Sequence, residues 1–136
     1  MLVLDTDAAI AIAKGDAQGE LFRSFIENSD EVICSEIMLI ECAHVAQKYV
    51  KAQAINSSTA KEWLVFIQGL VDRVYSVQPD VLESLHEALR LDHSPYDIFP
   101  LILAKRYNAT LVSLDQKLIN LCVSEGLSVC TEVSLD

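Results

Sequence analysis

The chain has 136 residues, 51% of them hydrophobic, and its 20 acidic and 10 basic residues give a formal net charge of -10. This length and apolar content suit one core, so we expect residues 1–136 to form a single domain. The acidic balance argues against broad, nonspecific nucleic-acid binding, because such binding depends mainly on basic side chains. The apolar runs all stop short of membrane-spanning length and no signal-type segment opens the chain, so we expect a cytoplasmic protein with no membrane partner.

The four cysteines form two pairs with seven residues between partners, Cys34 with Cys42 and Cys122 with Cys130. Each lies in an apolar setting, which predicts buried, reduced thiols. A zinc site or a disulfide is the alternative, although structural zinc favours much shorter ligand spacing.

Short apolar runs alternate with longer stretches of helical periodicity. The predicted order is a strand followed by two helices, repeated three times, and then a strand, a helix and a final strand. Residues 2–4 predict the first strand and residues 6–13 the first helix, with a break at residues 14–16 before a second helix. Asp5 therefore lies at the carboxyl end of a strand. Asp7 falls in the first turn of the helix, where we favour a capping role over metal binding.

A second strand is predicted over residues 32–34, with Ser35 as the N-cap of the helix that follows. Glu36 lies in the first turn of this helix, where a carboxylate simply complements the helix dipole. Glu41 lies inside the helix between two apolar residues, which is unfavourable for a charged side chain unless it opens onto a polar cleft. Glu41 is therefore the better functional candidate.

The middle of the chain predicts structural elements only. Thr59 and Glu62 have the spacing of a capping box, so we expect a helix from there to about Val71. Residues 73–77 predict a strand, and Pro79 suits the start of the next helix. The apolar side chains of that helix share one face: Val81, Leu82, Leu85 and Leu89.

Two further acids come late in the chain. Asp97 is predicted to be the N-cap of a helix through residue 107, because Pro100 then falls in the first turn, where backbone N-H groups have no intrahelical partner. A strand over residues 110–113 leads to Asp115. A last helix ending at Gly126 and a short final strand complete a parallel, helix-covered sheet.

The carboxyl ends of parallel strands meet at one edge of a sheet, where ligands bind. The acids that we expect to converge there are Asp5, Glu41, Asp97 and Asp115. Clustered carboxylates repel one another unless cations bind between them, so this arrangement predicts a site for divalent cations.

Three segments and the order of these acids carry a resemblance to a known family. The segments are LVLDTD, SEIMLIECAHV and SPYDIFPLILAKRYNATLVSLDQKL, in which Ser113 precedes Asp115 by two residues. Along essentially its whole length the chain resembles the PIN domain family, and especially the small VapC-type toxin ribonucleases of toxin-antitoxin pairs. The resemblance implies an α/β protein with a three-layer α/β/α fold around a central parallel sheet of about four to five short strands.

The resemblance also implies an endoribonuclease that holds Mg²⁺ or Mn²⁺ and uses a metal-activated water to hydrolyse RNA phosphodiester bonds. The catalytic and metal-binding residues that it implies are Asp5, Glu41, Asp97 and Asp115. Thr6 and Ser113 would be orienting hydroxyls, with Asp7 as an accessory acid. The implied partners are an RNA substrate, an antitoxin protein and a second copy of the chain in a homodimer, with the partner surfaces on the first two helices and the helix of Glu41.

Two alternatives stay open at this stage. The segment LVLDTDAAI also resembles the opening of haloacid-dehalogenase-like phosphatases, in which Asp5 would be the nucleophile and Asp7 the acid. Ala9 departs from that pattern, and Glu41 would then have no role. The other alternative is a non-catalytic PIN-like binding module, against which the intact set of four acids argues.

Two positions near the acids bear on substrate binding. Gln116 stands where PIN ribonucleases often carry a basic residue, which leaves Lys117 as the nearest cation. His93 lies shortly before Asp97, and we expect it to be a surface or packing residue rather than a substrate contact.

Overall fold

The computed structural model describes residues 1–130, and its elements follow the predicted order with one short 3-10 helix added. Five parallel strands form a sheet of order β3-β2-β1-β4-β5. The strands are β1 Leu2–Leu4, β2 Val32–Ser35, β3 Arg73–Tyr75, β4 Thr110–Val112 and β5 Val129–Cys130. The predicted central parallel sheet is therefore confirmed.

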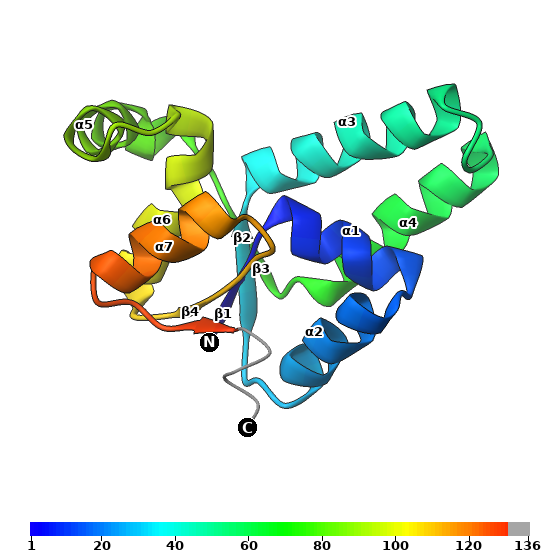
Figure 1. Cartoon of the computed structure of the whole chain (residues 1–136), viewed down its shortest axis with the longest axis horizontal. Helices are drawn as coiled ribbons and strands as arrows, with labels where there is room; N and C mark the ends of the chain where they lie inside the picture. Colours follow the sequence, from blue (N-terminus) through cyan, green and yellow to red (C-terminus); the bar gives the residue numbers. More distant parts are fainter. Residues whose placement is uncertain (131–136) are drawn as a thin grey trace.

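Helices cover both faces of this sheet and complete the three predicted layers. On one face lie α1 Thr6–Lys14, α2 Ala17–Glu27, α3 Glu36–Lys51 and α4 Ser57–Leu70, and on the other lie α5 Val81–Leu91, α6 Pro95–Tyr107 and α7 Gln116–Ser124, with the 3-10 helix η1 Gln78–Asp80 before α5 (Figure 1). Within residues 1–130, no helix is both long and apolar enough to cross a lipid bilayer.

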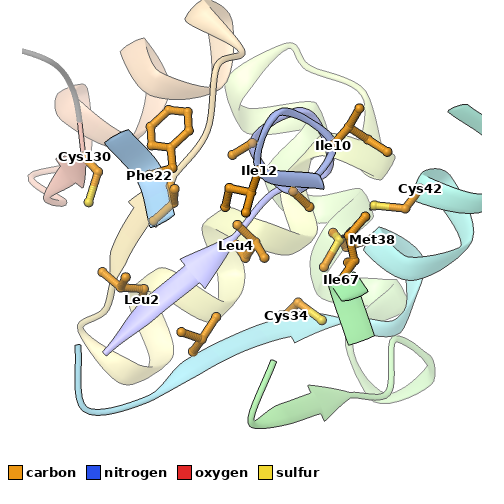
Figure 2. Packing of buried hydrophobic residues seen from close by; sticks show 14 residues of the cluster. Leu2, Leu4, Ile10, Ile12, Phe22, Cys34, Met38, Cys42, Ile67 and Cys130 are labelled. Atoms are coloured by element: carbon orange, nitrogen blue, oxygen red, sulfur yellow. Dashed lines mark hydrogen bonds between the residues drawn. The ribbon is translucent and has the colours of Figure 1, made fainter. Parts of the chain in front are cut away.

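Alternation along the strands divides the core between the two faces. Leu2 and Leu4 of β1 pack with the helices α1 to α4, whereas Val3 belongs to the cluster on the α6 side. Figure 2 shows Ile12 of α1 beside Leu4, in the cluster that also holds Met38 of α3. Because both faces of β1 are buried, this strand and the residue that follows it are held firmly in place.

The cysteines are free and buried, as the sequence predicted, at Cys34, Cys42, Cys122 and Cys130. Burial raises the pKa of Cys34 and of Cys42 to about 12. A thiol with such a pKa stays protonated at neutral pH and makes a poor nucleophile or metal ligand. These cysteines are therefore part of the core.

The predicted start of α6 is wrong. Ser94 occupies the N-cap position and Pro95 is the first helical residue, so Asp97 lies in the first turn rather than before it. Pro95 has the fixed φ that suits a first helical position, and this moves the start of the helix back from Asp97. Pro100 consequently lies inside the helix.

The predicted capping box at the start of α4 is also wrong. Asn56 is the N-cap, and its side-chain oxygen accepts a hydrogen bond from Thr59 N at 2.8 Å. Asn caps helices at least as well as Thr, so the helix gains a turn at its amino end.

The apolar face of α5 points outward. Leu82 and Leu89 are 79% and 75% exposed, and Val81 and Leu85 are exposed as well. The small residues Ser84 and Ala88 are buried instead. The periodicity identified the apolar face correctly, but this face does not contribute to the core.

Candidate metal and active site

A pocket of about 420 Å³ opens at the carboxyl edge of the sheet. The acids in its lining include the four that the sequence predicted and one accessory acid: Asp5, Asp7, Glu41, Asp97 and Asp115. Two of them follow strands directly or by a short loop, and the others come from helices α1, α3 and α6. Figure 1 shows α1 and α3 on one side of this edge and α6 and α7 on the other. The structure thus brings all the predicted acids into one cavity.

Ser113 connects the acids that come from the sheet. Its hydroxyl donates a hydrogen bond to Asp5 Oδ2 at 2.8 Å, lies 3.3 Å from Asp7 Oδ1, and accepts one from Asp115 N at 3.0 Å. The side chain is buried, and the adjacent pairing of β1 with β4, Leu4 opposite Val112, brings it beside Asp5. One hydroxyl therefore fixes three acidic positions.

Asp7 lies in the first turn of α1, as predicted, but Asp5 rather than Asp7 occupies the N-cap position of this helix. The Asp7 carboxylate accepts a hydrogen bond from Leu114 N at 2.9 Å, which ties the start of α1 to the loop after β4. Burial raises the pKa of Asp7, and the nearby charge of Asp115 adds to this rise. Asp7 thus braces the loop that carries Ser113 and Asp115, and its carboxylate adds to the four that the sequence predicted for the metal ion.

Among the acids of the pocket, Asp5 has the most strongly raised pKa. Burial raises the pKa of Asp5 to about 7, with further contributions from the charges of Asp7 and Glu41, against the lowering effect of the Ser113 hydrogen bond. A carboxyl group with such a pKa is held in its charged form only at a cost in free energy. A cation bound beside Asp5 would remove that cost.

Glu41 enters the pocket from the opposite wall. It is half-buried on α3, and burial together with the charge of Asp97 raises its pKa. Thr6 lies close enough for its hydroxyl to counter this rise in the pKa of Glu41, yet Thr6 Oγ1 is buried and makes no hydrogen bond of regular geometry within the described chain. The Thr6 hydroxyl therefore lies beside Glu41 at the site.

His93 lies against Asp97, which the sequence did not predict. Its Nδ1 is 3.6 Å from Asp97 Oδ2, and both ring nitrogens are buried without a regular hydrogen bond among residues 1–130. Burial raises the pKa of Asp97, and the nearby His93 and Lys117 oppose that rise. The available signal was the four-residue spacing of His93 and Asp97, although helix α6 begins between them.

The sequence matches the PIN domain family over residues 2–123. The chain belongs to the PIN domain family. The convergence of its acids at the carboxyl edge of a parallel sheet is the arrangement that the resemblance implied. The haloacid-dehalogenase-like alternative gains no support, because it leaves Glu41 and Asp97 without a role in a pocket that both of them line.

Solved structures share this PIN fold at low sequence identity. PAE2754 from Pyrobaculum aerophilum superposes with a TM-score of 0.72 at 16% identity, over 88% of this chain and 82% of that one. VapBC2 from Rickettsia felis, bound to a promoter DNA fragment, gives 0.68 at 17% identity over 95% and 96%. VapC20 from Mycobacterium tuberculosis, a toxin that cleaves the sarcin-ricin loop, gives 0.66 at 18% identity over 93% and 96%. No curated protein sequence matches the chain significantly.

The acids of this PIN domain are chemically suited to bind a divalent cation, but their side chains are not arranged around a single ion position. Among residues 1–130, no group of three or more His, Cys, Asp or Glu side chains is arranged to hold a single ion as it stands. The pocket nevertheless presents carboxylate oxygens, the ligands that Mg²⁺ and Mn²⁺ prefer. Burial, together with the charges of Asp7 and Glu41, raises the pKa of Asp5, and a bound cation would favour its charged form. Binding would require these side chains to close on the ion.

Proposed function

We propose that this PIN domain is a divalent-metal-dependent endoribonuclease that hydrolyses RNA phosphodiester bonds. Asp5, Glu41, Asp97 and Asp115 would hold Mg²⁺ or Mn²⁺. The observation that carries the proposal is the Ser113 hydroxyl bound to Asp5 inside an acidic pocket in which the pKa of Asp5 is about 7. Such a pocket holds its negative charge at a cost in free energy unless a cation binds in it.

When bound, the metal ion would activate a water molecule and stabilise charge on the phosphate oxygens. The side chains themselves do the positioning. The Ser113 hydroxyl is hydrogen-bonded to both the Asp5 carboxylate and the backbone N-H of Asp115, and so fixes their relative positions. Asp7 accepts a hydrogen bond from Leu114 N and so holds the loop between Ser113 and Asp115 in place. Glu41 and Asp97 line the same pocket from α3 and α6, and a scissile phosphate would bind there through the metal ion.

An antitoxin partner is part of the proposal. The neighbour from Rickettsia felis is a VapBC complex bound to promoter DNA, which supports a partner protein for this chain. Within residues 1–130, the pocket is lined by six acidic side chains and one lysine. We propose that the antitoxin inhibits by placing a basic side chain among these acids, where the charge of the side chain would replace that of the metal ion.

We also propose a homodimer in the cytoplasm. The sequence predicted partner surfaces on the first two helices and the helix of Glu41, and this stays a prediction. The exposed apolar row on α5 adds another candidate surface, formed by Val81, Leu82, Leu85 and Leu89. A continuous apolar row of this kind supports a protein contact. The buried, free cysteines suit a reducing compartment.

The test is incubation of purified protein with a panel of structured RNAs in Mn²⁺, in Mg²⁺ and in EDTA, followed by mapping of the cut ends. We expect discrete cuts that require the metal ion. Release of phosphate from small esters would indicate the phosphatase alternative, and RNA binding without cutting would indicate the binding module.

A further inference from the structure

The acidic pocket extends along α1 to a second group of residues at the other end of that helix. Lys14, Asp16 and Tyr49 line this end, and Lys14 is the only lysine or arginine in the lining among residues 1–130. The first turn of α1, with Asp7, and its last residue, Lys14, lie about 10 Å apart along the helix axis. Residues from both ends of α1 line this one pocket. Helix α1 lies beside α3, which carries Glu41 and Tyr49 (Figure 1).

Lys14 is held over the pocket by two contacts. Its ammonium group donates a hydrogen bond to Tyr49 Oη at 3.1 Å and lies 5.3 Å from the centroid of the Tyr49 ring. It is 3.9 Å from Asp16 Oδ2, but Asp16 also caps α2 by accepting a hydrogen bond from Gly19 N at 2.7 Å. The Asp16 carboxylate thus interacts with both Lys14 and the amino terminus of α2. It therefore neutralises the charge of Lys14 only in part, and Lys14 can still attract an anionic ligand.

Tyr49 is braced from behind by a second ring. Tyr49 and Trp63 contact edge to face, with ring centroids 5.3 Å apart and planes at 73°. This pair joins α3 to α4, and both rings are half-buried, while Tyr49 also lines the pocket. A fixed aromatic ring beside a cation is the combination with which proteins bind single-stranded nucleic acid, through base stacking and phosphate contact.

We propose that Lys14 and Tyr49 form a subsite for one nucleotide of single-stranded RNA next to the bond that is cut. Lys14 contacts the phosphate, using N-H donors beyond the one given to Tyr49, and Tyr49 stacks on the base. The inference rests on the proposed function and deepens it, because it assigns a nucleotide subsite to residues outside the proposed metal ligands. A base that stacks on Tyr49 must be free of its own duplex stack, so the strand must be single there.

The acidity of the chain makes such a contact necessary. RNA approaching a protein with a net charge of -10 is repelled, and phosphate affinity comes mainly from basic side chains. Metal ions would offset the acids at one end of the pocket, and Lys14 is the cation available at the other. The alternative is that Lys14 and Tyr49 only tie α1 to α3, in which case the pair affects stability and not substrate affinity.

Steady-state cleavage of a short single-stranded oligoribonucleotide separates these roles. Lys48 is the matched control, because it is exposed on the same helix as Tyr49 and does not line the pocket. We expect Lys14→Gln to raise KM about fivefold or more with kcat changed by less than about twofold, and to lower the slope of log KM against log salt by about one. Lys14→Arg should restore the affinity. Equal KM values for Lys14→Gln and Lys48→Gln overturn the proposal.

Substitutions of Tyr49 separate the ring from the hydroxyl. Tyr49→Phe keeps the ring and should leave KM near the wild-type value, whereas Tyr49→Leu should raise KM about fivefold or more through lost stacking. Thermal unfolding of each variant is followed by circular dichroism. A lower Tm and a lower kcat with unchanged KM would show a purely structural pair and overturn the proposal.

A separate measurement covers the case in which the wild-type protein cleaves no RNA and the proposed function fails. The same oligonucleotide, labelled with a fluorophore, is titrated in Ca²⁺ and followed by anisotropy. Weaker binding to Lys14→Gln than to Lys48→Gln supports the subsite. Equal binding to the two variants, absence of binding to the wild type, or equal competition by duplex RNA of the same sequence overturns it.

Discussion

Ser113 Oγ donates a hydrogen bond to Asp5 Oδ2 at 2.8 Å, which joins two residues 108 positions apart in the sequence. This bond lowers the pKa of Asp5 from a value that burial has raised. It thus helps to keep a carboxylate available for a cation in a pocket that disfavours negative charge. Ser113 is buried, so the bond is shielded from water.

We predict that Ser113→Ala lowers RNA cleavage by about 10- to 100-fold, the usual cost of losing a residue that orients a metal ligand. Without the hydrogen bond the pKa of Asp5 rises above about 7, so a higher pH is needed to ionise it. The rising limb of the pH-rate profile should therefore move to higher pH. Ser113→Thr should restore activity, and Ser124→Ala, on the exposed surface of α7, serves as the control.

Replacing a proposed metal ligand should remove activity without unfolding the protein. We predict that Asp97→Asn lowers cleavage in Mg²⁺ or Mn²⁺ by about 100-fold or more, because the carboxylate is then lost from the pocket. The Tm without metal should stay level or rise, since one repelling charge is gone. Glu20→Gln, on the exposed surface of α2, should change neither property. Unchanged cleavage by Asp97→Asn would contradict the proposed chemistry.

The metal-free protein should lose stability as the pH rises from about 4 to about 7. The pKa of Asp5 is raised to about 7 from an ordinary value of 3.8, so between these values the folded state binds more protons than the unfolded state. The contribution of Asp5 to stability is therefore largest at low pH and is lost as the pH rises through the folded pKa. The prediction is measured as the difference in Tm between wild type and Asp5→Asn, which should become less favourable to wild type with rising pH.

Added Mn²⁺ should raise the Tm of the wild type much more at pH 8 than at pH 5, because metal ions and protons compete for the same carboxylates. A stabilisation by Mn²⁺ that does not depend on pH, or one that persists in Asp5→Asn, would place the cation elsewhere.

His93 should support metal binding through Asp97. Because His93 opposes the rise in the pKa of Asp97, its removal should leave that carboxyl less ionised and less well oriented. We predict that His93→Ala raises the Mn²⁺ concentration needed for half-maximal activity about tenfold, with kcat at saturating Mn²⁺ close to wild type. His44→Ala, an exposed histidine on α3, is the control. Equal metal requirements would show that His93 only packs.

The α5 face should carry the proposed dimer contact. Leu85→Glu combined with Leu89→Glu places two like charges within an exposed apolar row. We predict that this variant sediments as a monomer at concentrations at which the wild type is a dimer, with the dissociation constant raised about 100-fold. Val123→Glu, at an exposed apolar position on α7, should leave the assembly unchanged. Dimers that survive the α5 substitutions would move the contact to another surface.

The sequence predicted the convergence of the acids because their positions depend on strong local signals. Asp5 follows an apolar strand and Asp115 follows another, and a parallel sheet brings such ends together whatever the intervening length. Glu41 could be chosen over Glu36 because an ionised side chain flanked by apolar residues needs a polar opening. That opening is the pocket that Glu41 lines.

Features that depend on competition between nearby signals or on tertiary packing were missed. Ser94 and Asp97 are both good N-caps, and the sequence alone did not show that Pro95 would decide between them. The periodicity of α5 shows which face of the helix is apolar, but not whether that face points toward the core or toward solvent. The contact of His93 with Asp97 depends on the path of the chain between α5 and α6, which no local pattern specifies.

The most direct test is calorimetric titration of Mn²⁺ into the protein at pH 8, comparing wild type with Asp5→Asn and Glu20→Gln. The account predicts saturable binding to wild type and to Glu20→Gln, and binding to Asp5→Asn that is at least about tenfold weaker. The same affinity in all three proteins, or no binding to the wild type, would contradict it.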